Sequence, residues 1–413
     1  MSHNHLVDTT GAPLRLIGVD RSGTEYACIQ GWGIFDGPSD ATSVANMAAW
    51  HINAVRLPLN EDCWLGINGV PAAYGGTNYR QAVQQYVTLL HQAGIAVILD
   101  LHLTAPGAVA ATGQVPMADA DHTPAFWSSV ASAYAADPSV VFDLFNEPFI
   151  STGNAQTSDP WACWLAGCTI NAGNGVPTSW QSAGMQQLVN AVRATGAAQP
   201  IMLGGLQWSN DLTQWLTHEP NDSAQQLAAS FHDYNFNTCN NQTCWNSQVG
   251  PVAQHVPVIT GEIGEDDCAG GFITQYMQWA DSTGISYVGW TWDTWNCSSG
   301  PALITAYDGT PTAYGAAFRS HLAALAQSRL VIIGGDPLTA FNGPAQSATA
   351  TARPPTSQPA TGAASVVPVG ELQPLGGDAV EEGVLPAEQG IVQGSGALRP
   401  PQVTGWRDRY PLT

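Results

Sequence analysis

Eight short apolar runs alternate with helix-length segments through the first 327 residues, and this alternation limits the possible fold more than any other feature. The runs are Leu14–Val19, Ala54–Pro58, Ala96–Leu101, Val140–Phe145, Ile201–Gly204, Leu227–Phe231, Val256–Thr260 and Ser286–Trp290. Because they are apolar almost throughout, they indicate parallel strands covered by helices. We therefore predict a (β/α)8 TIM barrel, for which about 320 residues is an ordinary size.

The segments between the runs carry apolar residues at three- and four-residue steps, as amphipathic helices do. Helices are expected at Ser39–Trp50, Tyr79–Ala93, Pro124–Ala135, Thr178–Ala194 and Phe272–Ser282. The alternative fold is an open doubly wound sheet, which would need a glycine-rich phosphate loop after its first strand. The segment Gly18–Gly23 has the wrong spacing for that loop.

The composition changes after residue 327. Residues 328–413 are rich in Pro, Ala, Gly, Thr and Gln, and the stretch Ala345–Gly370 is typical of a flexible linker. We expect a barrel domain over residues 1–327 and a linker-like, disordered tail over residues 328–413. All ten His and fourteen of the fifteen Trp precede residue 328, so we expect the chemistry in the barrel.

The chain is strongly acidic, with 32 Asp and Glu against 11 Arg, no Lys and a formal net charge of −21. Such a charge repels phosphate backbones and anionic lipid surfaces, so neither nucleic acid nor a membrane is an expected partner. No apolar run approaches the roughly 20 residues needed to span a bilayer. A neutral substrate is compatible with this charge, and we expect a monomer.

Eight cysteines without any CxxC pair argue against zinc ribbons and thioredoxin-like motifs. Their even number, mostly in Gly-, Asn- and Asp-rich stretches, indicates up to four disulfides and an oxidising compartment; free buried cysteines are the alternative. Eight cysteines permit 105 connectivities. Spacing favours two local pairs, and adjacent loops at the C-terminal end of the barrel suggest two more: Cys163–Cys168, Cys239–Cys244, Cys28–Cys63 and Cys268–Cys297. We expect a secreted protein whose signal peptide has been removed from this sequence.

Polar and aromatic residues follow the predicted strands, where a (β/α)8 barrel builds its active site. Glu147 and Glu262 come directly after apolar runs, and a carboxylate there costs desolvation free energy unless it is paired or functional. The other residues at these positions are Arg56, His102, Asn146, Trp208, His232, Tyr234, Trp290 and Trp292.

Two carboxylates that face each other among aromatic side chains indicate glycoside hydrolysis. One protonates the leaving oxygen, and the other attacks the anomeric carbon. Trp faces suit the apolar faces of sugar rings, and Trp32 and Trp208 are candidate sugar platforms, with plain packing an equal alternative. Two structural carboxylates bonded to Arg or to the backbone are the alternative for the glutamates.

No metal and no other cofactor is expected. The pair His3-Asn-His5 precedes the first strand and so lies at the wrong end of the barrel, and Asp119-Ala-Asp-His122 is a weak metal motif. A metal-dependent barrel hydrolase would need His-x-His at the end of the first strand, where Gly18-Val-Asp20 stands instead.

Six motifs occur in order along the chain. They are Asn53-Ala-Val-Arg56-Leu-Pro, Leu99-Asp-Leu-His102, Val141-Phe-Asp-Leu-Phe-Asn-Glu147-Pro, His232-Asp-Tyr234, Ile259-Thr-Gly-Glu262-Ile-Gly and Tyr287-Val-Gly-Trp-Thr-Trp292. With them, roughly residues 8–327 resemble glycoside hydrolase family 5, the cellulase family of the retaining (β/α)8 clan A enzymes. The resemblance implies that Glu147 is the acid/base and Glu262 the nucleophile.

The resemblance also implies a surrounding set of substrate-binding residues, namely Arg56, His102, Asn146, His232, Tyr234 and a Trp after the eighth strand. Asn146 is expected to bond the sugar 2-hydroxyl and Tyr234 to lie near Glu262. Trp290 and Trp292 share a strand face, and Trp292 is the preferred candidate. Gly261 is expected to leave room for the close approach of a sugar.

The activity implied is that of a secreted, retaining endo-β-1,4-glucanase, or cellulase, acting on a β-linked polysaccharide or oligosaccharide. Mannanase, xyloglucanase, xylanase and β-1,3-glucanase specificities stay open, because loops around the site decide between them. The alternative from another class is a barrel that binds carbohydrate without cleaving it, and the presence of both glutamates argues against it.

Overall fold

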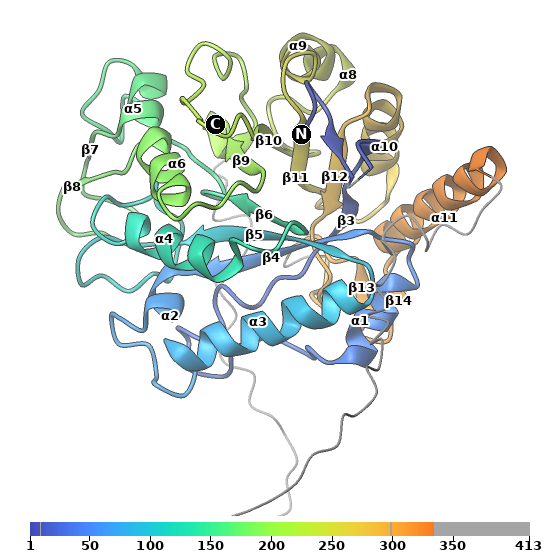
Figure 1. Ribbon diagram of the computed structural model, residues 1–413, viewed down its shortest axis with the longest axis horizontal. Helices are drawn as coiled ribbons and strands as arrows, with labels where there is room; N and C mark the ends of the chain where they lie inside the picture. The colour runs from blue at the N-terminus through green and yellow to red at the C-terminus, as the bar shows by residue number, and fades with distance from the viewer. Residues whose placement is uncertain (9, 298–299, 334–413) are drawn as a thin grey trace, which may run out of the picture. The chain divides into compact units, whose positions relative to one another are not determined.

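The computed structural model describes residues 1–8, 10–297 and 300–333, and in them eight parallel strands close into a barrel (Figure 1). Going round the barrel, the strands are β3 (Ile17–Asp20), β4 (Ala54–Asn60), β5 (Ala96–Leu103), β6 (Val140–Asp143), β9 (Ile201–Gly204), β10 (Leu227–Tyr234), β11 (Val258–Gly264) and β12 (Ser286–Gly289). Each predicted apolar run overlaps one of these strands, which confirms the (β/α)8 barrel. Leu14 instead belongs to β2 (Pro13–Leu14), which pairs with β1 (Leu6–Val7).

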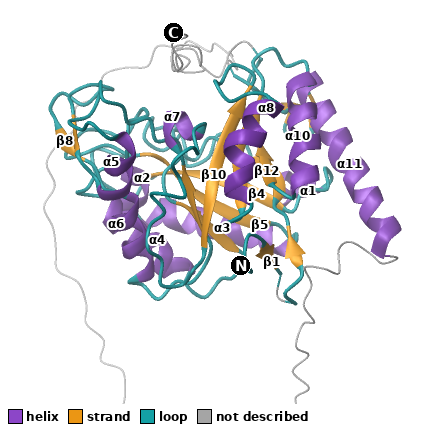
Figure 2. Ribbon diagram, turned by 90° about the horizontal axis from the view of Figure 1, so that it is seen from above, coloured by secondary structure: helices purple, strands orange, loops and turns teal. Residues whose placement is uncertain are grey.

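Helices lie outside the strands (Figure 2). The longer ones are α1 (Ala41–Ala48), α3 (Thr77–Gln92), α4 (Thr123–Tyr134), α6 (Met185–Arg193), α10 (Gly271–Thr283) and α11 (Ala313–Ile333). The shorter ones are α2 (Glu61–Leu65), α5 (Pro160–Ala166), α7 (Leu206–Ser209), α8 (Gln242–Cys244), the π-helix η1 (Trp245–Val249) and α9 (Gly250–Ala253). A further strand pair, β13 (Ile304–Ala306) with β14 (Thr310–Pro311), precedes α11.

The helix predicted at Thr178–Ala194 is wrong in its first half. Residues Trp180–Gln181 form strand β8, which pairs with β7 (Thr169–Ile170), and the helix begins only at Met185. Gly184 packs directly against the Leu165 carbonyl, where a Cβ would collide. Pairing with a distant segment therefore overrides the local helical pattern.

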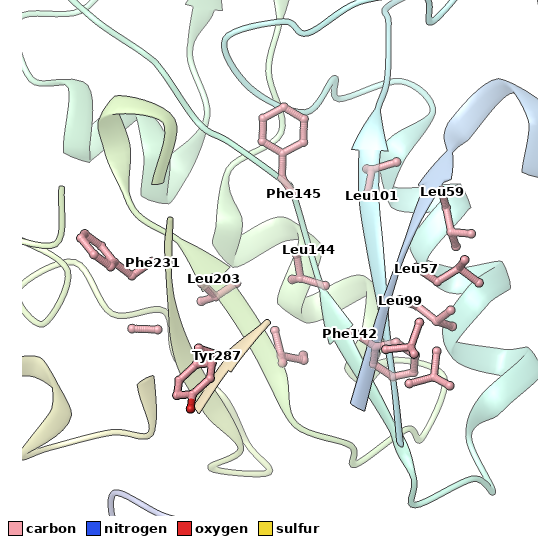
Figure 3. Close-up of a cluster of buried hydrophobic side chains, with 14 of the residues drawn as sticks. Leu57, Leu59, Leu99, Leu101, Phe142, Leu144, Phe145, Leu203, Phe231 and Tyr287 are labelled. Carbon is pink, nitrogen blue, oxygen red and sulfur yellow. The ribbon is translucent and has the colours of Figure 1, made fainter. Parts of the chain in front are cut away.

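Two apolar layers hold the barrel together. Side chains on the outer face of the strands, such as Leu57, Leu99 and Phe142, pack towards the helices (Figure 3). Alternate residues fill the inside in a second buried cluster, which contains Ala54, Ile98, Val141, Met202, Ala228, Ile259 and Val288. Leu6 of the N-terminal hairpin joins this inner cluster, so the hairpin closes the N-terminal end of the barrel.

The inner face becomes polar two residues further along several strands. Arg56 follows Ala54, Asp100 follows Ile98 and Asp143 follows Val141, and all three polar side chains are fully buried. Because strand faces repeat every two residues, these charged groups lie directly above the apolar layer. The C-terminal end of the barrel therefore begins with a layer of buried charge.

All four predicted disulfides are present, so the predicted connectivity is confirmed: Cys28–Cys63, Cys163–Cys168, Cys239–Cys244 and Cys268–Cys297. Helix α11 runs to Ile333, past the predicted domain boundary at residue 327. The rest of the predicted tail, residues 334–413, lies outside the described residues. None of the helices in the described ranges combines the length and the apolar character that crossing a membrane requires.

Candidate active site

Seven of the predicted site residues meet at the C-terminal end of the barrel in one connected network. They come from five strands or the residues that directly follow them: Arg56, His102, Asn146, Glu147, His232, Tyr234 and Glu262. Glu147 and Glu262 are each only 3% exposed.

Glu262 reaches the inside of the barrel through an irregularity in strand β11. Phe231 pairs with Thr260, whereas His232 pairs with Glu262, so Gly261 is an extra residue on this strand. Strict alternation from the inward-facing Ile259 would have turned Glu262 towards the helices. A bulge of this kind shifts the alternation by one residue and so directs the Glu262 carboxylate into the site.

Two donors hold the Glu262 carboxylate. Arg56 donates from Nη1 to Oε1 at 2.9 Å, and the Tyr234 hydroxyl donates to Oε2 at 2.5 Å. The guanidinium is a permanent positive charge, so Glu262 has an ion-pair partner inside the barrel. The expected proximity of Tyr234 to Glu262 is confirmed.

Glu147 has different neighbours. His232 Nδ1 lies 3.1 Å from Oε1, and the Gln114 side-chain amide donates to Oε2 at 2.6 Å. Gln114 lies in the long loop between β5 and α4, where no periodicity or motif marks it in the sequence. Neither neighbour of Glu147 carries the permanent charge that Glu262 meets.

Burial lowers the pKa of His232 to about 3, and nearby Arg56 and His102 act in the same direction, while Glu262 opposes them. At neutral pH the ring is therefore uncharged, and Nδ1, which faces Glu147, donates to that carboxyl group when it carries the ring proton and accepts from it otherwise. On the other side of the ring, a Cβ at Gly261 would lie 2.7 Å from Nε2. The space at Gly261 is taken by His232, so the expectation that it admits a sugar is wrong.

Arg56 also binds the charged layer beneath the glutamates. Its guanidinium lies 3.0 Å from Asp20, 3.0 Å from Asp100 and 2.9 Å from Asp143, and it donates to the Asn146 amide oxygen at 2.8 Å. Burial raises the pKa of Asp100 to about 7, although Arg56 opposes the shift, and it raises the pKa values of the other two aspartates well above their usual range.

These three aspartates were missed in the sequence as site residues. Asp100 stands two residues before His102, and alternation places both on one face; Asp100 accepts a hydrogen bond from His102 Nδ1 at 2.7 Å. The same two-residue step from the inner apolar layer would have found Asp143. The network thus orients both His102 and Asn146, which are 3.5 Å apart between ring and amide nitrogens.

The tryptophans that the sequence analysis considered for the site lie in different surroundings. The Trp290 ring stacks against His102, with 5.4 Å between the ring centres, whereas Trp292 is fully buried with its ring edge against Trp50. The preference for Trp292 is therefore wrong: β12 ends at Gly289, and strand alternation does not continue as far as Trp292. Trp208 is half-buried and stacks on Phe149, with 5.0 Å between ring centres.

Trp32 is 44% exposed, which makes it the most accessible large apolar side chain among the described residues. Its ring centre lies 5.8 Å from that of Tyr26, which in turn lies 6.3 Å from Trp295. Trp295 lies 6.1 Å from Trp290. Aromatic rings therefore lead from His102 outwards to an exposed indole.

Two groups of described residues place possible metal-binding atoms within 4.8 Å of one another: Glu147, His232 and Glu262, and separately Glu61, Asp119 and His122. At the first group, a cation would meet the guanidinium that already contacts Glu262. At the second, the Thr123 hydroxyl donates to Glu61 at 2.6 Å, and the Thr104 hydroxyl lies within hydrogen-bond distance of both Glu61 and Asp119.

The 4.8 Å limit also applies to the two glutamates: one carboxylate oxygen of Glu147 lies within 4.8 Å of one carboxylate oxygen of Glu262. A protonated carboxyl at one position and an ionised carboxylate at the other can act on the same bond from its two sides. Such a pair is suited to acid-assisted displacement at carbon.

Comparisons with known proteins identify the family and the fold of the chain. Residues 7–296 match the model of the cellulases, glycosyl hydrolase family 5. Among solved structures, a β-glucanase from Saccharophagus degradans is 22% identical, with 78% of this chain and 92% of that chain covered and a TM-score of 0.58. The same enzyme in complex with cellotetraose gives 21% identity, the same coverage and the same TM-score.

The catalytic domain of the major endoglucanase from Xanthomonas campestris pv. campestris is 19% identical, with 78% of this chain and 98% of that chain covered and a TM-score of 0.57. At these identities the solved structures show a shared fold.

Proposed function

Because the chain belongs to glycosyl hydrolase family 5, whose model matches well over half of it, we propose that it is a retaining endo-β-1,4-glucanase with Glu147 as acid/base and Glu262 as nucleophile. Membership makes the protein a glycoside hydrolase on a (β/α)8 barrel. The roles of the two glutamates and the identity of the polymer are what we propose.

The separation of the two carboxylates carries the proposal. Retaining glycosidases hold their carboxyl groups about 5–5.5 Å apart, whereas inverting enzymes leave about 6.5–9.5 Å for a water molecule between base and sugar. One oxygen atom of each carboxyl group lies within 4.8 Å of the other, and this close approach supports the first class. At this separation the nucleophilic carboxylate attacks the anomeric carbon directly, without an intervening water molecule.

The environments of the glutamates support the division of roles. Glu262, beside Arg56 and Tyr234, attacks the anomeric carbon as a carboxylate and forms a glycosyl ester, while Glu147 gives its proton to the departing glycosidic oxygen. Glu147 then takes a proton from water, the hydroxide oxygen bonds to the anomeric carbon, and Glu262 leaves as the carboxylate. Neutral His232 can donate a hydrogen bond to Glu147 when the latter is ionised.

The choice of β-1,4-glucan rests on the comparisons and on charge. The similar β-glucanase from Saccharophagus degradans binds cellotetraose, and the similar Xanthomonas enzyme is an endoglucanase. A chain with net charge −21 suits a neutral polymer. The four disulfides support secretion into an oxidising compartment, where such a polymer is found.

Covalent trapping tests the nucleophile. A 2-fluoro cello-oligosaccharide with a good leaving group should form a stable ester, and peptide mapping should place it on Glu262. Proton NMR of early products from an unmodified substrate should show the β-anomer first. An α-anomer, or an ester on Glu265 or Asp293, would refute the assignment.

Leaving-group dependence tests the acid. Glu147→Gln removes the proton donor but keeps the shape, and general acid catalysis is worth about 10²–10⁴-fold. The glycosylation rate should fall by that factor on cello-oligosaccharides and much less on an aryl cellobioside with an acidic phenol. Equal losses on both substrates would show that Glu147 is not the acid.

A panel of cellulose, mixed-linkage β-glucan, β-1,3-glucan, mannan, xyloglucan and xylan tests the polymer specificity. The fastest release of reducing ends is expected on β-1,4-glucan. Binding without any release of reducing sugar would instead indicate a non-catalytic carbohydrate-binding barrel.

A further inference from the structure

The chain that follows strand β9 adopts an unusual backbone conformation beside the candidate acid. Gln207, Trp208 and Ser209 have φ angles of 55°, 56° and 60°, so three consecutive non-glycine residues are left-handed. Each such residue costs of the order of 1 kcal/mol or more, and the conformation persists only where surrounding contacts impose it. The contacts made by these residues therefore indicate what the conformation achieves.

Two of the contacts lie on either side of Glu147. The Ser209 hydroxyl donates to the carbonyl oxygen of Asn146 at 2.9 Å, and the backbone N–H of Trp208 donates to the carbonyl oxygen of Pro148 at 3.0 Å. The peptide group between Asn146 and Glu147 and the one between Pro148 and Phe149 are thus both held by neighbouring residues of one loop.

The next residue in the loop holds the partner of Glu147. The Asn210 side-chain amide donates to the carbonyl oxygen of His232 at 2.8 Å and accepts from the backbone N–H of Cys239 at 2.8 Å. His232 in turn lies against the Glu147 carboxylate. Residues 208–210 therefore link the ends of β6 and β10 at the point where the two side chains meet.

Gly204, the last residue of β9, makes room for this arrangement. A Cβ there would collide with the Ser209 hydroxyl and would lie 3.2 Å from Pro148 Cδ. The Gly204 carbonyl accepts a hydrogen bond from the Trp164 ring at 2.8 Å, which anchors the start of the loop to α5. The Ser209 hydroxyl is fully buried, so its bond to Asn146 does not compete with solvent.

We propose that Ser209 is a positioning residue for the general acid: its hydrogen bond to the Asn146 carbonyl, with those of Trp208 and Asn210, fixes the direction in which Glu147 presents its proton. This inference rests on the proposed role of Glu147. A general acid has to lie in line with the glycosidic oxygen, and a misplacement of about 1 Å can cost about 10²-fold in rate. The left-handed turn is the conformation that brings the three donors to their acceptors.

The test is Ser209→Ala, compared with Ser43→Ala as a matched control. Ser43 is also a buried serine whose hydroxyl donates to a backbone carbonyl, that of Asp40 at 2.8 Å, but it lies at the start of α1. Both variants lose one buried hydrogen bond, so similar drops in Tm are expected. Glu147→Gln is measured in parallel on the same substrates.

For Ser209→Ala we expect kcat on cellotetraose to fall about tenfold with KM nearly unchanged, and the rate on dinitrophenyl cellobioside to change less than about twofold. Ser43→Ala should keep wild-type kinetics on both substrates.

Equal losses on the two substrates, or wild-type kinetics for Ser209→Ala, would overturn the positioning role. If Glu147→Gln keeps its own leaving-group dependence in that case, the proposed function stands and only this inference fails. If Glu147→Gln shows no such dependence, the proposed function itself fails.

Discussion

Arg56 places one guanidinium among four carboxyl groups and one side-chain amide, with every contact between 2.8 and 3.0 Å. Burial would lower its pKa, but the surrounding carboxylates outweigh this effect and raise the pKa well above the ordinary value. A lysine would keep the charge but lose the planar fork that reaches several acceptors at once.

We therefore predict that Arg56→Lys destabilises the fold by about 3–5 kcal/mol, because it leaves buried carboxylates without a partner. Arg15→Lys is the control, since the Arg15–Asp281 pair is 2.8 Å long but partly exposed, and it should cost about 1 kcal/mol or less. Urea unfolding at pH 7 measures both. Similar losses for the two variants would contradict the importance of the buried network.

The two tryptophans after β12 allow a comparison of function with packing. Trp290→Phe should lower kcat/KM about tenfold, because Trp290 lies beside His102 in the site. Trp292→Phe should leave kcat/KM within about twofold but cost about 1–3 kcal/mol of stability, since its ring packs on Trp50 in the core. The reverse pattern would restore Trp292 as the site residue.

At the scale of the element, disulfides connect the loops that surround the site. Cys28–Cys63 joins the loop after β3 to helix α2 across 35 residues, whereas Cys163–Cys168 spans five residues at the end of α5. Loop entropy makes the longer closure the more stabilising one. The long-range bond thus ties together two consecutive β/α units.

Replacing both cysteines by serine should cost about 4 kcal/mol for Cys28–Cys63 and about 2 kcal/mol for Cys163–Cys168. The free energy of unfolding in urea, without reductant, measures the difference. A larger loss from the short loop would show that native packing around α5, and not the unfolded chain, dominates.

At the scale of the whole molecule, burial raises the pKa of many carboxyl groups above the ordinary value. Burial raises the pKa of Glu25 to about 8, of Asp100 to about 7, and of Asp62 and Asp293 to about 6. The folded protein then binds protons that the unfolded chain releases above about pH 4, so this stabilisation is present in acid and lost as pH rises to about 8. His232, with its pKa lowered to about 3, acts in the opposite direction: its contribution is lost as pH falls from about 6.5.

Several acids outnumber the one histidine, so the free energy of unfolding should fall between pH 5 and pH 8. Glu25→Gln removes one group whose pKa is raised by burial. The decrease in the free energy of unfolding between pH 5 and pH 8 should therefore be smaller in the variant by about 2–4 kcal/mol. Urea unfolding of both proteins at the two pH values tests this. An unchanged fall in the variant would show that Glu25 is not protonated in the fold.

A further prediction at this scale concerns the removal of the tail, residues 335–413. Its low-complexity composition predicts that a chain shortened to residue 334 keeps the turnover of the full chain on a soluble β-glucan. Initial rates of the full and the shortened chain on the same β-glucan test this prediction. A large loss of turnover would show that residues 335–413 act on the barrel.

The barrel and most of the residues that gather at its C-terminal end could be predicted from the order and apolar character of the segments. Each of the eight apolar runs between helix-length segments overlaps a buried strand, and Glu147 follows one of them. The cysteine pairing could also be predicted, because consecutive β/α units place their loops side by side. These features depend on local pattern and on chain order, both of which can be read without coordinates.

Only the tertiary structure decided how the site residues face one another. The extra residue at Gly261 reverses the direction that alternation assigns to Glu262, and it is visible only in the pairing of β10 with β11. Gln114, Ser209 and the turn that separates Trp290 from Trp292 likewise reach their positions through contacts with distant segments. Local periodicity cannot encode such contacts, because their free energy comes from groups far away in the chain.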